Sequence, residues 1–357
     1  MVSLMKHVQT SADKIRGQDV VLLLGGTGAG KSTSVLYLAG CQLCSEIVRG
    51  RTHYFAYNPP SDLKSVTVSA FMQSHTKALN AVPVQWYVSP GGPLQSIALC
   101  DSPGFDDTEG VETDIANAYG IIEAMKGCRS VRLVVLVSFR NIGDRAEGIC
   151  KLSHTLVRLF RRIDSCLDSL TYVWTKMDIE SQRYNAVHEI LKEKLEQLNA
   201  NEKNNRDFVM LLTDMVKKTA SGAVVINPLD SGSRQDVIQH IMHSSPCREP
   251  QTAFRVFATD SAMNELQVQL NKVSDSIVNA LERFDISLLT YKLEQLQIVT
   301  KFIDVPAATR SERCTLDSIR QKVNGILDEF CAQMDRCLEV DCHSVKNNLD
   351  TCQQRLK

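Results

Sequence analysis

The sequence has no hydrophobic run of the length that a membrane-spanning helix needs. Its longest strongly apolar stretch, from about Val131 to Phe139, is less than half of the ~20 residues required. Near the amino end, Lys6 and His7 come before any apolar run of signal-peptide length. Val2 excludes N-myristoylation, which needs glycine at that position. We expect a cytoplasmic protein with no intrinsic membrane segment.

The chain also lacks an excess of either charge. It has 40 lysines and arginines against 41 aspartates and glutamates, so the formal net charge is −1. Because no global field draws such a chain to nucleic acid or to an anionic membrane, we expect no nucleic-acid partner. With 43% hydrophobic residues among 357, the composition is typical of a globular protein with one large domain or two.

The 12 cysteines are scattered and do not resemble the disulfide framework of a small secreted protein. Cys41 and Cys44 have the CxxC spacing, but no second pair or histidine cluster completes a zinc site. We interpret the cysteines as reduced thiols, and metal or redox use of this pair is the minor alternative.

Predicted strands alternate with predicted helices through the first 230 residues. The strands are expected at Asp19–Gly25, Pro83–Ser89, Gln95–Asp101, Val131–Val137, Leu170–Trp174 and Ala223–Ile226. The helices are expected at about Ser34–Ala39, Thr113–Met125, Gly148–Cys166 and Glu180–Lys218. The turn-forming Pro90–Pro93 segment makes the second and third strands an antiparallel hairpin. This order predicts an α/β fold, a three-layer sandwich around a mostly parallel sheet with right-handed crossovers.

An α-helical extension follows the α/β part. Apolar residues alternate at spacings of three and four in two seams, which are Met263, Leu266, Leu270, Val273, Ile277, Ala280 and Phe284, and then Leu316, Ile319, Val323, Ile326 and Phe330. With a break near Asp304–Pro306, they predict a helical hairpin resembling a coiled coil. Either this hairpin packs on the α/β part or it offers a dimer or partner surface. The predicted domains are a lead-in at 1–18, a nucleotide-binding domain at 19–245 and the helical region at 260–357.

The strongest motif follows the first strand and precedes the first helix. It is a P-loop, composed of Gly25, Gly26, Thr27, Gly28, Ala29, Gly30, Lys31 and Ser32. The glycines let backbone N–H groups point at phosphates, and the helix adds its positive amino end. Lys31 is expected to neutralise phosphate charge and Ser32 to bind Mg²⁺. We include Thr33 among the nucleotide-binding positions.

Two further motifs stand at strand ends. The second motif runs from Asp101 to Gly104. Asp101 is expected to reach Mg²⁺, and the Gly104 N–H is expected to contact a γ-phosphate. The third motif is Thr175-Lys176-Met177-Asp178. A carboxylate at Asp178 can accept hydrogen bonds from the N1–H and N2 groups of guanine, whereas adenine offers no such donor pair. The Lys176 stem is expected to lie over the base.

These three motifs resemble G1, G3 and G4 of the translation-factor-related (TRAFAC) class of P-loop GTPases. The string DSPGFDDT at 101–108 is similar to that of septins, chloroplast import-receptor GTPases and the AIG-type GTPases of immunity-associated proteins. The last are our preferred analogue because they carry helical carboxyl-terminal extensions. The resemblance covers about residues 19–230 and implies GTP or GDP with Mg²⁺ as ligands.

The sequence departs from the family pattern at several positions. Thr175 stands where G4 usually has asparagine, and no Ser-Ala-Lys follows the last strand, where Asn227 is our candidate. Thr67 is the candidate G2 residue and a candidate Mg²⁺ ligand. Thr67 and Gly104 are also the candidate catalytic residues. The alternative for Thr67 is an ordinary β-branched residue in a strand. Phe105 replaces the glutamine that positions water in Ras-like GTPases.

We therefore expect slow hydrolysis, raised by a partner or by a second protomer. Arg140, Arg145 and His154 are candidates to act across a homodimer, which forms through the nucleotide-binding domain or the helical region. The leading hypothesis is a slow Mg²⁺-dependent GTPase that works as a switch or assembly protein. The alternatives are a non-hydrolysing GTP-binding scaffold, whose helical region binds partners, and a P-loop ATPase.

Overall fold

The computed structural model describes residues 13, 15–61, 63, 66, 80–89, 91–104, 121, 122, 124, 125, 127–143, 145–254, 260–283, 285, 287–293, 317, 318, 320–332, 335 and 336. The chain divides into two compact units, Ser3–Ala258 and Thr259–Lys357.

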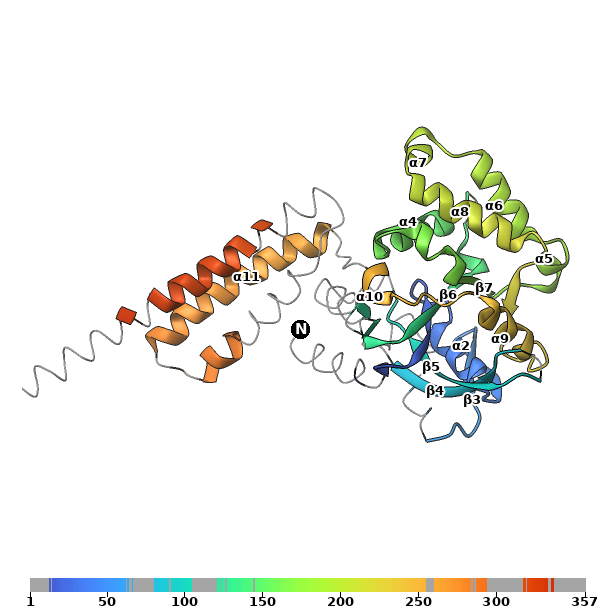
Figure 1. Cartoon of the computed structure of the whole chain (residues 1–357), viewed down its shortest axis with the longest axis horizontal. Helices are drawn as coiled ribbons and strands as arrows, with labels where there is room; N and C mark the ends of the chain where they lie inside the picture. The colour runs from blue at the N-terminus through green and yellow to red at the C-terminus, as the bar shows by residue number, and fades with distance from the viewer. Residues whose placement is uncertain are drawn as a thin grey trace, which may run out of the picture. The chain divides into compact units, whose positions relative to one another are not determined.

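A six-stranded sheet forms the centre of the first unit (Figure 1). Across the sheet the strands are β4 (Asn80–Tyr87), β5 (Leu94–Asp101), β1 (Asp19–Leu24), β6 (Ser130–Ser138), β7 (Leu170–Thr175) and β8 (Val224–Ile226). β4 is antiparallel to β5, and all other neighbours are parallel. The five parallel strands therefore end at one common edge of the sheet.

The strand pattern has a simple hydrophobic cause. β1, β6 and β7 are buried along their whole length, as expected of parallel strands that are covered on both faces. The edge strand β4 instead mixes buried and exposed positions. The predicted α/β sandwich, its mostly parallel sheet and the Pro90–Pro93 hairpin are confirmed.

Helices cover both faces of the sheet. One face packs against α4 (Glu147–Leu159), α6 (Ala186–Glu196) and α8 (Arg206–Thr219), which lie together in Figure 1. The other face packs against α2 (Lys31–Leu38) and α9 (Arg234–His243). α10 (Pro250–Ala253) is a short helix near the end of this unit.

The polar stretch expected to be helical from Glu180 to Lys218 is interrupted. It contains α5 (Ile179–Arg183), α6, α7 (Ala200–Asn204) and α8. Asn199 caps α7 in a capping box, and Asn205 accepts a hydrogen bond from the Phe208 N–H at 3.1 Å. Asparagine side chains therefore start new helices within the stretch. The helix expected at Gly148–Cys166 likewise ends at Leu159, and two 3₁₀ turns, η2 (Ile163–Ser165) and η3 (Leu167–Ser169), follow it.

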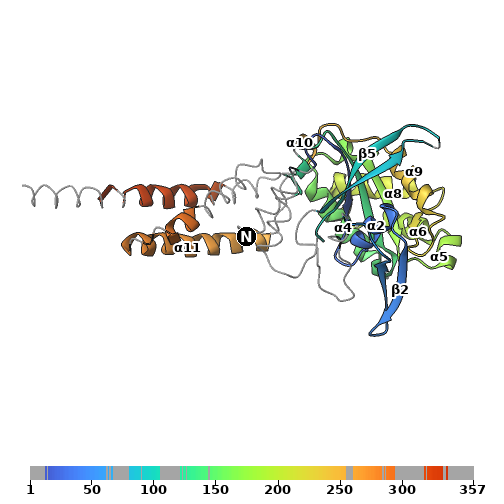
Figure 2. The ribbon, with the colours of Figure 1, turned by 90° about the horizontal axis from the view of Figure 1, so that it is seen from below.

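A two-stranded hairpin, β2 (Leu43–Val48) with β3 (Arg51–Ala56), was not expected from the sequence. Figure 2 shows it projecting from the first unit. Its Ile47 is 80% exposed, so the hairpin lacks the clean alternation that signals a half-buried strand. Cys44 lies in β2, and the described residues contain no cluster of three or more metal-ligand side chains.

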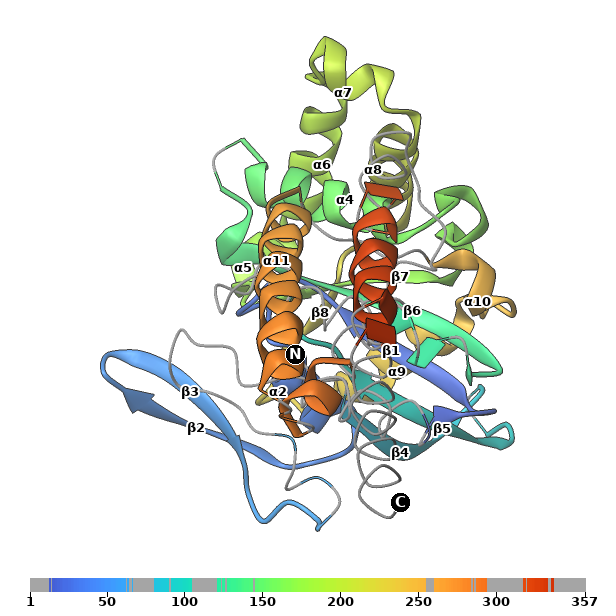
Figure 3. The ribbon, with the colours of Figure 1, turned by 90° about the vertical axis from the view of Figure 1, so that its left-hand side faces the viewer.

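The second unit contains α11 (Asp260–Glu282) and a helical segment at 320–332, which lie side by side in Figures 1 and 3. The seam residues buried here are Leu270, Ile277, Ala280, Val323 and Ile326. The expected break near residue 304 lies outside the described residues. None of the described helices is both long and apolar enough for a membrane span.

Candidate functional site

The P-loop connects the end of β1 to the start of α2. Its first glycine is required by a close approach to the neighbouring strand. A Cβ atom at Gly25 would lie 2.6 Å from the Leu136 carbonyl oxygen of β6. Only glycine therefore lets the loop pass over β6 and turn back toward α2.

The loop and the start of α2 form an environment that suits an anion. Lys31 is 8% exposed, and its Nζ donates to the carbonyls of Gly25 at 2.9 Å and Gly26 at 3.1 Å. The N-cap residue is Gly30, so no N-cap side chain accepts a hydrogen bond from the first N–H groups of α2. The first turn of α2 also has no acidic residue. The first N–H groups of a helix lack partners within it and carry its positive dipole end. These residues fit a polyphosphate.

Two side-chain oxygen groups that can bind a metal ion lie next to each other beside this loop. The Ser32 hydroxyl donates to Oδ2 of Asp101 at 2.7 Å, and Asp101 is buried at the end of β5. The register of the sheet sets this contact, since Asp101 pairs with Leu23 near the end of β1. A hydroxyl and a carboxylate are hard oxygen ligands of the kind that Mg²⁺ prefers. The predicted metal-ligand pair therefore comes together and fits Mg²⁺.

The segment after Asp101 packs directly on the P-loop. The buried Ser102 hydroxyl, which was not among the residues predicted from the sequence, donates to the Leu23 carbonyl at 2.6 Å. A Cβ at Gly104 would lie 2.2 Å from Thr27 Oγ1 and 2.9 Å from Thr27 Cα. Thr27 Oγ1 is buried and has no hydrogen-bond partner among the described residues. Gly104 is thus placed against the loop, and any side chain at this position would push the two segments apart.

The third motif reaches the P-loop through two hydrogen bonds. Thr175 Oγ1 donates to the Ala29 carbonyl at 2.7 Å, and Lys176 Nζ donates to the Gly28 carbonyl at 2.6 Å. Lys176 has a left-handed backbone, with φ at 57°. Desolvation lowers the pKa of Lys176, and the nearby Arg140 charge lowers it further. The end of β7 is therefore joined to the loop at the end of β1.

Asp178 lies just beyond this contact and caps α5. Its Oδ1 accepts from the Ser181 N–H at 2.8 Å, and its Oδ2 accepts from the Ser181 hydroxyl at 2.7 Å. Both bonds lower the pKa of Asp178, and the bond from the Ser181 N–H has the larger effect. Asp178 is therefore ionised at neutral pH. A carboxylate has about four acceptor positions. Ser181 and nearby backbone N–H groups use part of this capacity, and the side chain is exposed to a ligand.

Asn227 begins a turn after β8. Its Oδ1 accepts from the Leu229 N–H at 3.2 Å, and its carbonyl accepts from the Asp230 N–H at 3.1 Å. Tyr37 of α2, which was not among the residues predicted from the sequence, donates to the Asp230 carbonyl at 2.8 Å. Burial raises the pKa of Tyr37, which keeps the hydroxyl a donor. The P-loop helix is thereby tied to the turn that holds Asn227.

The remaining candidates have different positions. Thr67 and Phe105 lie outside the described residues. Arg140, in the 3₁₀ turn η1 (Phe139–Asn141), and Arg145 are both exposed and follow β6. His154 instead stacks on Phe208 with ring centroids 4.5 Å apart, within the α4–α8 layer. This is the face of the sheet opposite to α2, so His154 does not belong to the P-loop site.

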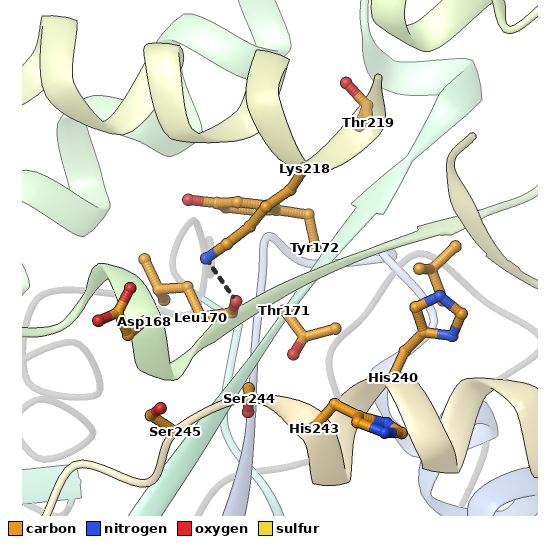
Figure 4. Close-up of a pocket in the computed structure, with 11 residues that line it drawn as sticks. Asp168, Leu170, Thr171, Tyr172, Lys218, Thr219, His240, His243, Ser244 and Ser245 are labelled. Atoms are coloured by element: carbon orange, nitrogen blue, oxygen red, sulfur yellow. Dashed lines mark hydrogen bonds between the residues drawn. The ribbon is translucent and has the colours of Figure 1, made fainter. Parts of the chain in front are cut away.

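A cavity of about 340 Å³ lies at the other edge of the sheet, by the amino ends of β7 and β8 (Figure 4). Figure 4 shows His240 and His243 on α9 at one side of it. Lys218 at its wall donates to the carbonyls of Leu167 at 2.6 Å and Leu170 at 2.9 Å, and pairs with Asp214. The charge and donors of Lys218 are thus satisfied within the fold.

The sheet order, the P-loop at the end of its central strand and the Ser32–Asp101 pair define a P-loop nucleotide-binding fold. No protein-family model matches the sequence, and no curated protein matches it. Among solved structures, the chain is similar to a dimerization-deficient mutant of Toc33 from Arabidopsis thaliana, with 16% identity, a TM-score of 0.38 and coverage of 67% of this chain and 88% of that one. It is also similar to the signal recognition particle receptor SRb-GTP/SRX complex from Chaetomium thermophilum, with 12% identity, a TM-score of 0.32 and coverage of 58% and 88%.

At these identities and TM-scores, the two likenesses carry no conclusion about the activity, ligands or partners of this chain.

Proposed function

We propose that this chain binds GTP and GDP together with Mg²⁺, as a nucleotide-controlled switch or assembly protein of the cytoplasm. The observation that carries the proposal is the hydrogen bond from Thr175 to Ala29. It holds the Thr175–Asp178 motif beside the phosphate loop, so in this proposal the motif contacts the base of a nucleotide whose phosphates occupy that loop.

In this proposal the phosphates bind between the P-loop and Lys31, and Ser32, Asp101 and Thr67 bind Mg²⁺. The Gly104 N–H contacts the γ-phosphate. Asp178 accepts from guanine N1–H and N2, Lys176 lies over the base, and the turn at Asn227 contacts the guanine O6 atom. Adenine lacks this pair of donors and would leave the Asp178 acceptor positions without partners, so we expect it to be disfavoured.

Competition between GTP and ATP for the Mg²⁺-loaded protein tests base recognition. We expect GTP to displace a fluorescent GDP analogue at a concentration at least tenfold lower than ATP. Asp178→Asn replaces an acceptor by a mixed donor and acceptor, so it should shift preference from GTP toward xanthosine triphosphate. Equal displacement by ATP and GTP would support the P-loop ATPase alternative instead.

We further propose that intrinsic hydrolysis is slow, because Phe105 stands at the position of a water-positioning side chain. Arg140, whose charge acts on Lys176, is the candidate to assist from a second protomer. Specific activity should then rise with protein concentration, and Arg140→Ala should flatten that rise. A wild-type specific activity that stays constant with protein concentration would contradict assistance by a dimer. The absence of multiple-turnover phosphate release would indicate a non-hydrolysing scaffold.

A further inference from the structure

A second cavity, of about 330 Å³, lies at the amino ends of β1, β5 and β6. Because parallel strands run from this edge toward the P-loop, the cavity is at the opposite edge of the sheet from the candidate nucleotide site. Its polar lining is Asp19, Gln95, Arg129, Ser130, Arg132 and Arg248. Three arginines and one aspartate give this lining a formal charge of +2.

One of the three arginines is neutralised by the aspartate. Asp19 accepts from Arg129 Nε at 2.9 Å and from a second Arg129 nitrogen, and also from Ser130 Oγ and Gln95 Nε2, each at 2.6 Å. The carboxylate is thus fully engaged. It is not available to balance the other two guanidinium groups.

Arg132 is the unusual member of the group. It is only 8% exposed, and its one hydrogen bond among the described residues runs from Nε to the Ser244 carbonyl at 3.1 Å. Desolvation lowers the pKa of Arg132, and the more distant Asp19 charge opposes this only in part. A buried charge without a counter-ion is costly. An anion in the adjacent cavity would remove that cost.

Arg248 is brought to the same cavity by a short β-bridge. Val131 N–H donates to the Cys247 carbonyl at 2.9 Å, and Cys247 N–H donates to the Val131 carbonyl at 2.8 Å. This bridge fixes the segment before Arg248 against the start of β6. The exposed Arg248 side chain has no partner within the described part of the chain, so it can turn toward a ligand at the rim.

We propose that this cavity binds a phosphate monoester, held by Arg132 at its wall and Arg248 at its rim. Guanidinium groups match the oxygens of a phosphate in a two-pronged geometry, and two of them balance its two negative charges. Gly25–Ser32 has no part in this site, so the proposal is independent of the nucleotide hypothesis. The phosphate can belong to a soluble ester or to a lipid headgroup.

The test is calorimetric titration of the full chain with glycerol 3-phosphate. The Lys31→Ala background removes binding at the P-loop. In this background we expect saturable binding that weakens at least tenfold in Arg132→Gln and severalfold in Arg248→Gln. Arg132→Lys, which keeps the charge but loses the planar fork, should be intermediate. Asp19→Asn should tighten binding, because it removes the negative charge beside Arg129.

Arg161→Gln is the matched control. Arg161 also donates its Nε to a backbone carbonyl at 3.1 Å, that of Phe254, but it does not line the cavity. It should bind like the Lys31→Ala parent. If Arg132→Gln fails to fold, the affinity of Arg248→Gln for glycerol 3-phosphate still tests the proposal, because Arg248 is exposed. Equal affinities for Arg248→Gln and Arg161→Gln would overturn the proposal.

Two further arms identify the ligand. Vesicles of phosphatidylcholine with phosphatidic acid, measured by co-sedimentation of the same variants, show whether a lipid headgroup is the source. Succinate serves as the carboxylate control, and equal Arg132-dependent binding of succinate would overturn the choice of phosphate. Failure of both glycerol 3-phosphate and the vesicles to bind would overturn the site itself.

Discussion

The Thr175 hydroxyl donates a 2.7 Å hydrogen bond to the carbonyl of Ala29, a residue 146 positions earlier in the chain. The resemblance to G4 leads one to expect asparagine here. The structure assigns to the threonine hydroxyl a bond between the end of β7 and the P-loop. At this position a short side-chain donor reaches the loop carbonyl.

Removal of this donor should weaken both the fold and the site. Thr175→Val keeps the shape but leaves the buried Ala29 carbonyl without its partner, which costs about 1–3 kcal/mol. We expect the free energy of unfolding to fall by about that amount and the affinity for GDP to fall severalfold. Chemical denaturation and nucleotide titration measure the two effects.

Thr175→Ser is the matched control for that change, because it keeps the hydroxyl. It should bind GDP like the wild type, and Thr175→Asn should also retain binding since its amide can donate. Wild-type stability in Thr175→Val would show that the hydrogen bond contributes nothing.

Gly104 should tolerate no side chain. Gly104→Ala places a methyl group against Thr27 Oγ1 and Thr27 Cα, so the segment after β5 must move away from the P-loop. We expect a loss of at least tenfold in affinity for a non-hydrolysable GTP analogue and a smaller loss for GDP. Gly127→Ala is the control, because its new Cβ meets Arg16 at an ordinary 3.8 Å. Equal analogue binding in the two variants would contradict the proposed role of Gly104.

Asp19 should stabilise the fold in a pH-dependent way. The hydrogen bond from Arg129, with those from Ser130 and Gln95, holds the pKa of Asp19 well below its ordinary 3.8. A carboxylate whose pKa is lowered by folding stabilises the protein above its ordinary pKa and loses that contribution as the pH falls below it. Asp19→Asn should therefore cost about 2 kcal/mol at pH 7, and the difference should shrink below about pH 4.

Denaturation of both proteins across this range measures the effect. Asp164→Asn is a suitable control, since its carboxylate pairs with Arg162 at the exposed surface and such pairs contribute little. If the free energy of unfolding of the wild type exceeded that of Asp19→Asn by the same amount at the lowest pH, the stabilising role of the ionised Asp19 would be contradicted.

Cys247 should be the most reactive of the described cysteines near neutral pH. A hydrogen bond from the Cys166 thiol lowers the pKa of Cys247, whereas burial raises the pKa of Cys128 to about 12. Because the thiolate is the nucleophile, alkylation of Cys247 by iodoacetamide should have its midpoint below the ordinary thiol pKa of about 8.5. Peptide mass spectrometry follows the reaction, and Cys166→Ala should move the midpoint upward. An unchanged midpoint in that variant would contradict the role of Cys166.

The sequence was most informative where burial is uniform. The apolar runs of β1, β6 and β7 predicted their positions because parallel strands covered on both faces leave little choice of residue. The motif order likewise predicted that Ser32 and Asp101 meet. Both conclusions depend on local patterns that the chain carries in consecutive residues.

Contacts between distant segments could not be predicted in the same way. The Tyr37–Asp230 bond joins residues 193 positions apart, and neither carries a local signal of the other. The β2–β3 hairpin has an exposed Ile47 in place of a regular pattern. The arginine-lined cavity depends on the Val131–Cys247 bridge, which brings Arg248 to strands that begin more than a hundred residues earlier.

The Tyr37 hydroxyl also has a mechanical consequence. It couples α2, whose amino end faces the P-loop, to the turn after β8, where Asn227 stands. A displacement of α2 must therefore pull on that turn or break the bond. A spectroscopic probe attached at the exposed Leu229 should report events at the P-loop, although the two lie in separate segments of the chain, and Tyr37→Phe should uncouple the signal.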